Sequence, residues 1–237
     1  MKIRGKKVEL NVEAIVFDKD GTLIGSIETL QYIFSEYVKA AHSLGYNTEK
    51  ESSRLFGASL YSVDTPLYTT YSSEVMTLVA ASVWLTYQYP WPKCRSIADE
   101  INRVAIQNLD KNVLYHPNPG AMEAIRFFSQ QVPVCIATSD NQESVKRLLQ
   151  HWEMKPLVKQ VVTSDEVKNG KPAPDLLIRL SEDLAIPTGK ILMIGDHEVD
   201  SLMAFNAGAH SISVGSKHLS SDDWVSNLQE LLDLNLE

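Results

Sequence analysis

Five short apolar runs recur along the chain, and most of them are nearly continuous rather than alternating with polar residues. They occupy residues 14–17, 132–137, 160–163, 191–195 and 211–214. Apolar runs of this length without alternation are typical of strands that are covered on both faces, as in a parallel sheet. The pattern therefore predicts a buried, mainly parallel β-sheet.

Apolar positions at helical spacing lie between these runs. Pro119 and Gly120 open one such segment and Pro174 opens another, which agrees with the preference for proline at the start of a helix. Two more segments, residues 145–152 and 224–232, show the same period. Strands that alternate with helices form βαβ units, so we expect an α/β protein with a doubly wound sheet.

About ninety residues between the first predicted strand and Pro117 break this alternation. Their apolar spacing predicts three helices, near residues 27–44, 75–83 and 97–105. A connection of this length inside an open sheet is better explained by an inserted helical domain than by a loop. The expected domains are a core of residues 1–25 and 113–237 and an inserted domain of residues 26–112.

The composition is ordinary for a globular protein, with 44% hydrophobic and 22% charged residues. A net charge of -8 argues against a surface that binds nucleic acid or an anionic membrane. Residues 1–13 lack the apolar stretch of a secretory signal and are expected to be a short leader or an edge strand. No run approaches the length of a membrane span, and two cysteines give no disulfide framework. We expect a cytoplasmic protein that acts on a small molecule.

Polar side chains follow the predicted strands at their carboxyl ends or lie in the loop that leads to the next strand. They belong to Asp18 and Asp20 after the first strand, where the backbone of Gly21 follows, to Thr138 and Ser139 after the second, to Lys171 before the fourth, and to Asp196 and Asp200 after it. Ligands of open α/β sheets bind at this edge, so these side chains are expected to converge on one site. Two carboxylates two positions apart at the end of a buried strand would repel each other unless a positive charge lies between them.

Each of these pieces also has an ordinary structural interpretation. Aspartate and glycine are common in turns, and Thr138 could cap the helix that follows it. A calcium-binding loop that begins at Asp18 is excluded, because Leu23 and Thr29 replace the required glycine and glutamate. The shared position of the candidate residues at one edge of the sheet favours a functional site over separate structural roles.

The sequence resembles the haloacid dehalogenase superfamily of phosphohydrolases, and in particular its phosphoglycolate-phosphatase-like branch. The resemblance covers nearly the whole chain and rests on four segments in this order: VFDKDGTL, CIATSD, GKPAPD and IGDHEVD. It implies a Rossmann-like core with a helical cap inserted after the first motif. It also implies a phosphatase that uses Mg²⁺ and an aspartyl-phosphate intermediate to hydrolyse a small phosphorylated metabolite, phosphoglycolate-like or a sugar phosphate.

The resemblance further implies a role for each candidate residue. Asp18 would be the nucleophile, and Asp20 would be the general acid and afterwards the general base. The implied metal ligands are the carboxylates of Asp18 and Asp196 and the backbone carbonyl of Asp20, while Asp200 would orient a bound water or the lysine. The implied phosphate-binding residues are Gly21, Thr138, Ser139 and Lys171.

Two alternative functions stay open at this point. A phosphomutase of the same superfamily shares the core motifs, and the cap would decide between mutase and phosphatase. A non-catalytic regulatory protein could also accept phosphate on an aspartate at a strand end, although the complete set of acids argues against it. The sequence leaves open the substrate and the choice between monomer and homodimer, and it predicts that His197 points to solvent.

Overall fold

The computed structural model describes residues 1–6, 8–25, 27–58, 65–66 and 72–236. The chain divides into two compact units, Met1–Ile24 with Pro117–Glu237, and Gly25–His116. Ser26, where the sequence analysis begins the inserted domain, lies outside the described residues. Each unit has a hydrophobic core of its own.

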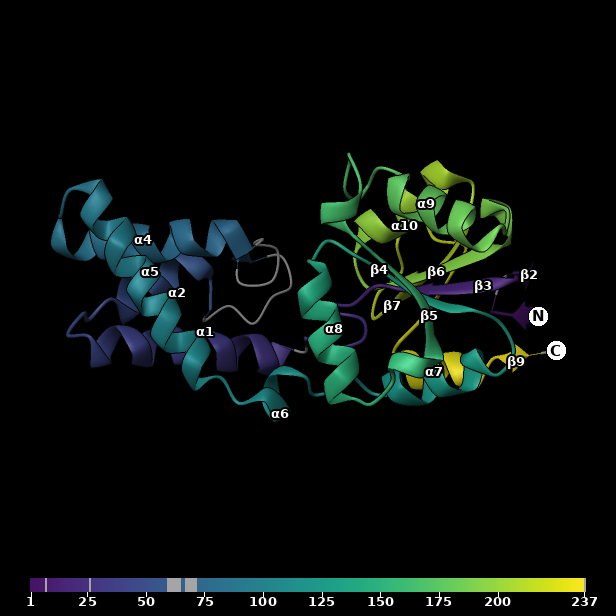
Figure 1. The fold of residues 1–237 in the computed structure, drawn as a ribbon, viewed down its shortest axis with the longest axis horizontal. Helices are drawn as coiled ribbons and strands as arrows, with labels where there is room; N and C mark the ends of the chain where they lie inside the picture. The colour runs from purple at the N-terminus through teal and green to yellow at the C-terminus, as the bar shows by residue number, and fades with distance from the viewer. Residues whose placement is uncertain (7, 26, 59–64, 67–71, 237) are drawn as a thin grey trace. The chain divides into compact units, whose positions relative to one another are not determined.

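Six parallel strands form the central sheet of the first unit, in the spatial order β5-β4-β3-β6-β7-β8 (Figure 1). They are β3 (Ala14–Phe17), β4 (Val134–Thr138), β5 (Val158–Thr163), β6 (Ile191–Gly195), β7 (His210–Val214) and β8 (Asp223–Val225). Phe17 of β3 is in register with Ile136 of β4 and Ile194 of β6. The predicted parallel sheet is confirmed. Because the strand order reverses beside β3, its carboxyl end is the point where such sheets bind ligands.

Helices cover both faces of this sheet (Figure 1). They are α7 (Ala121–Ser129), α8 (Gln142–His151), α9 (Asp175–Leu184), α10 (Glu198–Ala207) and α11 (Leu228–Leu232), with short 3₁₀ turns at Lys155–Leu157, Ser164–Glu166 and Thr188–Lys190. Leu177 of α9 and Met203 of α10 belong to the same buried cluster as Val16. The next strand residue, Phe17, points to the opposite face, where its ring lies 6.4 Å from that of Phe128. Burial on both faces explains why the sequences of β3, β4 and β6 are almost continuously apolar.

The two ends of the chain differ from the sequence-based expectation. The N-terminal residues form a hairpin, β1 (Lys2–Arg4) with β2 (Glu9–Asn11), and β1 also pairs with β9 (Asn235–Leu236) in a separate three-stranded antiparallel sheet. The expectation of a short leader is therefore wrong, whereas the edge strand is present as β2, which lies at the edge of this sheet with β1 in its middle. Trp224 lies in β8 rather than in the closing helix, because α11 begins only after Asn227, whose side chain accepts a hydrogen bond from the Glu230 N–H (3.0 Å).

The second unit is helical in its described part. Its helices are α1 (Ile27–Ser43), α2 (Glu49–Phe56), α4 (Ser72–Tyr87), α5 (Trp91–Asn108) and α6 (Lys111–Leu114). The three helices predicted from apolar spacing correspond to α1, α4 and α5, whose inner faces share one core with Phe56 of α2. The sequence analysis missed α2, because only Ser52 and Phe56 of its eight residues are buried and the apolar period is too short to see.

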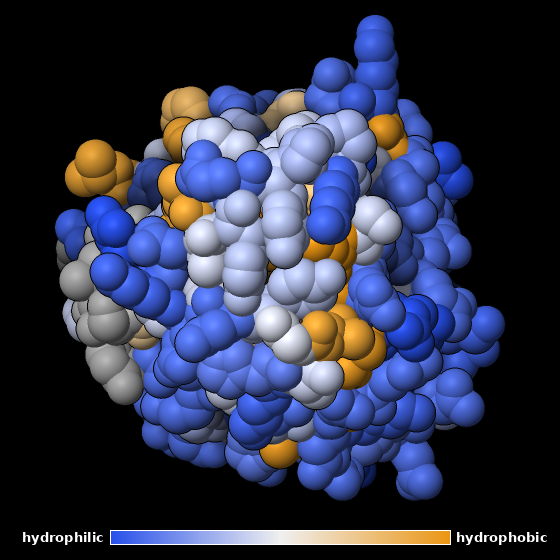
Figure 2. All heavy atoms as spheres, turned by 90° about the vertical axis from the view of Figure 1, so that its left-hand side faces the viewer, coloured by the Kyte–Doolittle hydropathy of each residue, from blue (hydrophilic) through white to orange (hydrophobic). Residues whose placement is uncertain are grey.

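The face shown in Figure 2 is mostly hydrophilic, with hydrophobic side chains in separate small areas. Partly exposed apolar side chains of the helical unit include Trp84, Leu85 and Trp91, each between 40% and 43% exposed. Isolated apolar side chains at a surface are normal for a folded protein. Among the described helices, none combines the length and the apolarity that crossing a membrane requires.

Candidate active site

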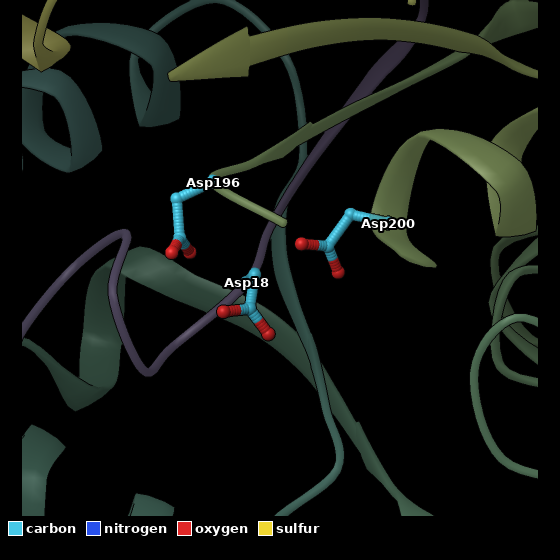
Figure 3. Close-up of side chains that lie close together, drawn as sticks. All are labelled: Asp18, Asp196 and Asp200. Carbon is cyan, nitrogen blue, oxygen red and sulfur yellow. The ribbon is translucent and has the colours of Figure 1, made fainter. Parts of the chain in front are cut away.

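Three aspartates meet at the carboxyl end of the central sheet. Asp18 directly follows β3, and its N–H donates a hydrogen bond of 2.8 Å to the carbonyl of Ile194 in β6. Asp196 directly follows β6, and Asp200 lies in the first turn of α10. One carboxylate oxygen from each aspartate lies within 4.8 Å of the other two, and Figure 3 shows the three side chains around one small region. The predicted convergence at this edge of the sheet is therefore present for these acids.

Lys171 places a positive charge inside this acidic cluster. Its ammonium group forms ion pairs with the carboxylates of Asp18 and Asp200, the latter at 2.6 Å. The side chains of Lys171 and Asp200 are each only 3% exposed, so solvent screens these pairs little. Three carboxylates against one ammonium leave a net negative charge when all four groups are ionised.

The electrostatics of the cluster fit a bound cation. Burial raises the pKa of Asp18 well above its ordinary value; Lys171 opposes this shift, and the neighbouring carboxylates add to it. Burial likewise raises the pKa of Asp196 to about 6, against the hydrogen bond from Thr22. A divalent cation would relieve the repulsion behind these shifts, and carboxylate oxygens are the ligands that hard cations prefer. Asp18, Asp196 and Asp200 can therefore hold a metal ion.

A tight turn after the first motif brings the chain against Asp196. Gly21 adopts a positive φ of 88°, and a Cβ atom at this position would overlap the Asp196 carboxylate. The Thr22 hydroxyl donates a hydrogen bond of 2.7 Å to Oδ1 of Asp196. The sequence analysis assigned no role to Thr22, which lies four positions after Asp18. Its hydrogen-bond partner, Asp196, lies 174 residues further along the chain, so no local sequence pattern could reveal the contact.

Asn118 closes the same turn from the other end of the inserted segment. Its side-chain amide donates to the backbone carbonyls of Gly21 (2.9 Å), Thr22 (3.1 Å) and Ile24 (3.3 Å). A bridge between Ile24 and Pro117 lies beside it. Asn118 therefore fixes the conformation of the turn that carries Gly21. The sequence analysis missed this residue, because an asparagine after a proline carries no signal of its own.

Thr138 and Ser139 follow β4 at the same edge of the sheet. Thr138 is 1% exposed, and its hydroxyl accepts a hydrogen bond of 3.1 Å from the Asp140 N–H. The cap of α8 is Asn141, whose side chain accepts from the Ser144 N–H at 3.0 Å, so Thr138 is not the helix cap. Ser139 is half-buried beside it.

Asp20 is placed differently from the three clustered aspartates. Its side chain is 59% exposed, and its Oδ1 lies 2.6 Å from the ammonium group of Lys19. The same ammonium group lies 2.9 Å from Oδ2 of Asp140. Burial disfavours the charge on Lys19, but Asp20 and Asp140 together raise its pKa above the ordinary value. The sequence analysis assigned nothing to Lys19, although a lysine between two aspartates was itself a visible signal.

His197 has an exposed side chain, as predicted, and it also has a structural contact. Its Nδ1 accepts a hydrogen bond of 3.4 Å from the Val199 N–H at the start of α10. Its own N–H donates to Oδ2 of Asp200 at 3.2 Å. The backbone of His197 therefore helps to orient Asp200, while the imidazole caps the helix.

Known proteins resemble this chain over most of its length. The family model for haloacid dehalogenase-like hydrolases matches residues 12–208. The phosphorylated carbohydrates phosphatase of Thermotoga maritima is 26% identical over 203 residues, which cover 85% of this chain and 84% of that protein. Protein CbbY of Rhodobacter capsulatus is 26% identical over 233 residues, 95% of each chain. A solved structure from Thermotoga maritima, assigned as a beta-phosphoglucomutase, has the same fold, with a TM-score of 0.68 and 22% identity over 94% of this chain and 97% of that one.

Proposed function

The chain belongs to the haloacid dehalogenase-like hydrolases, and from this premise we propose that it is a magnesium-dependent phosphatase of a small phosphorylated metabolite. The observation that carries the proposal is the ion pair between the buried carboxylate of Asp18 and Lys171, inside a cluster of further acids. A carboxylate at a strand end can attack phosphorus, and a buried ammonium beside it can offset the charge of the phosphate. The reaction proceeds through an aspartyl-phosphate on Asp18.

Asp18, Asp196 and the backbone carbonyl of Asp20 would hold Mg²⁺ in this enzyme. The all-oxygen donor set and the raised pKa values of Asp18 and Asp196 support this assignment. When bound, the ion supplies positive charge that offsets the carboxylates and the phosphate. Asp200 orients Lys171, with which it forms an ion pair at 2.6 Å.

The chemistry consists of two displacements at phosphorus. In the first, a carboxylate oxygen of Asp18 bonds to phosphorus, the bond to the leaving oxygen breaks, and Asp20 gives that oxygen a proton. In the second, Asp20 takes a proton from a water molecule, the water oxygen bonds to phosphorus, and the Asp18 carboxylate is released with inorganic phosphate. Lys171 offsets charge in both steps. The proposed contacts to the other phosphate oxygens come from Gly21, Thr138 and Ser139.

The helical unit, residues 25–116, is assigned the role of a cap that selects the substrate. In the proposed reaction the residues of the core bind the phosphoryl group, which all candidate substrates share. Discrimination between metabolites therefore needs contacts to the rest of the substrate, which we assign to the helical unit. The name of the Thermotoga maritima relative supports a phosphorylated carbohydrate as the first substrate class to test, and a phosphoglycolate-like acid as the second.

The test is release of inorganic phosphate by the purified protein with Mg²⁺ from a panel of phosphorylated sugars, short phosphorylated acids and p-nitrophenyl phosphate. Phosphate release by the unmodified chain, and none by Asp18→Asn, supports the proposal. Conversion of a sugar phosphate to its isomer without net phosphate release would identify a phosphomutase instead. Phosphorylation of the protein without turnover would identify a non-catalytic phosphate acceptor, and inactivity on the whole panel would refute the enzyme assignment.

A further inference from the structure

Lys19 is a buried lysine whose charge lies between two loops of the core. Its side chain is only 4% exposed, and its ammonium group lies 2.6 Å from Asp20 and 2.9 Å from Asp140. Its backbone carbonyl accepts hydrogen bonds from the N–H groups of Leu23 (2.9 Å) and Ile24 (3.0 Å). Both ends of this residue are therefore fixed, one in the turn after β3 and the other against the loop after β4.

Asp140 is a rigid anchor for this ammonium group. Its Oδ1 accepts hydrogen bonds from the Asn141 N–H (2.7 Å) and from the Asn141 side-chain amide (3.0 Å), while its Oδ2 faces Lys19. Its own N–H donates to the Thr138 hydroxyl at 3.1 Å. Because the N–H and both carboxylate oxygens of Asp140 have partners, the position of the Lys19 ammonium follows from the loop after β4.

Asp20, in contrast, is 59% exposed, and an exposed carboxylate needs no lysine to remain stable. An apolar side chain at position 19 would also fill the buried space without the cost of removing an ammonium group from water. The pairing therefore has its main effect on where the Asp20 carboxylate lies. The contact is made to Oδ1, which leaves Oδ2 as the oxygen that can carry a transferred proton.

We propose that Lys19 is a positioning residue, which holds the Asp20 carboxylate in the orientation needed for proton transfer and ties that orientation to the loop that carries Thr138. Lys19 itself exchanges no proton and forms no bond to substrate. This inference rests on the proposed function, since Asp20 is the acid and base only if the protein catalyses the proposed phosphoryl transfer. The buried ammonium group of Lys19 thereby connects the first motif, which contains Asp20, with the second, which contains Asp140.

The test compares Lys19→Met with the unmodified enzyme on an alkyl phosphate and on p-nitrophenyl phosphate. An alkyl leaving group needs the proton from Asp20, whereas a nitrophenolate does not. General acid–base help is typically about a hundred- to ten-thousand-fold, so partial misplacement should lower kcat/KM on the alkyl phosphate, which reports the steps up to departure of the leaving group, by about tenfold or more. The loss on p-nitrophenyl phosphate in its first step should stay within about threefold. Lys19→Arg keeps the charge and should restore part of the difference.

Lys146→Met is the matched control, because the Lys146 side chain is 65% exposed on α8 and its variant should leave both rates unchanged. Thermal unfolding of each variant separates stability from positioning, since a partly unfolded enzyme loses both activities in the same proportion. If Lys19→Met does not fold, Asp140→Asn is the second variant, because it removes the charge that holds the Lys19 ammonium group. It should also reduce the activity on the alkyl phosphate more than the activity on p-nitrophenyl phosphate.

Equal losses in kcat/KM on the two substrates, or no loss, in variants of an active enzyme would overturn the role of Lys19 and leave the phosphatase intact. An unmodified protein that hydrolyses neither phosphate would instead refute the proposed function, and the role of Lys19 with it.

Discussion

The Thr22 hydroxyl donates a hydrogen bond of 2.7 Å to Oδ1 of Asp196, a residue 174 positions further along the chain. This contact orients a carboxylate that we assign to the metal. Thr22→Val keeps the shape and removes the donor, so the affinity for Mg²⁺ should fall by about tenfold or more. The measurement is Mg²⁺ binding by calorimetry, together with the Mg²⁺ concentration that gives half-maximal activity. Thr22→Ser retains the hydroxyl and is the control; unchanged Mg²⁺ affinity in Thr22→Val would contradict the orienting role.

The two aspartates of the first motif should have separable roles. Asp18→Asn removes the proposed nucleophile at nearly constant shape, so neither turnover nor a phosphoenzyme should be detected. Asp20→Asn keeps the nucleophile and loses the proton donor and the later base, so turnover should fall by about a hundred- to ten-thousand-fold while phosphoenzyme accumulates. Rapid acid quench of a reaction with labelled substrate measures the phosphoenzyme. Hydroxylamine-sensitive phosphoprotein formed by Asp18→Asn would place the nucleophile at another residue.

Removal of the metal should abolish activity. Asp18 and Asp196, the two carboxylates that we assign to the metal, belong to a cluster whose oxygens lie within 4.8 Å of one another, so a chelator should stop turnover and added Mg²⁺ should restore it. Ca²⁺ should restore it poorly, since it takes more ligands at longer distances than Mg²⁺. Steady-state rates after dialysis against EDTA, followed by titration with each cation, provide the measurement. Full activity in excess chelator is the result that would exclude the metal assignment.

The stability of the metal-free protein should depend on pH in a direction set by the acidic cluster. The pKa of Asp196 is raised to about 6 in the folded protein, above the value of about 4 expected in the unfolded chain. The folded state therefore holds this proton more tightly, and the free energy of unfolding should fall as the pH rises from about 4 to about 6. Mg²⁺ should restore stability above pH 6, because the proposed metal site exists only in the folded state.

Urea unfolding at a series of pH values, with chelator and with Mg²⁺, measures this effect. Asp196→Asn removes the titrating group at nearly constant shape, so its metal-free unfolding free energy should decrease less over the same pH range. Other carboxylates have lowered pKa values, as Asp140 does, and give the opposite slope, which is why the comparison between the two proteins is the informative quantity. Identical slopes for the two proteins would contradict the raised pKa of Asp196.

The sequence alone predicted the strands best where both faces are buried. Residues 14–17 and 191–195 are predicted as strands that the structure has with the same bounds, because a short apolar run without helical spacing is typical of a strand buried between two layers. The family followed from the four motifs and is confirmed by the match over residues 12–208. The candidate residues followed from one topological fact, since parallel strands bring their carboxyl ends to the same edge.

Contacts between distant segments were decided only by the tertiary structure. The partner of Thr22 and the three carbonyls held by Asn118 depend on how loops meet after the sheet has formed. The pairing of β1 with β9 joins the two ends of the chain. Both strands are too short and too polar to be predicted from the sequence. Lys19 is the clearest case: the sequence analysis assigned it no role, and its burial and its second partner, Asp140, come from the packing of β3 beside β4. A residue's type limits the bonds that it can make, and only the fold determines which partner lies within reach.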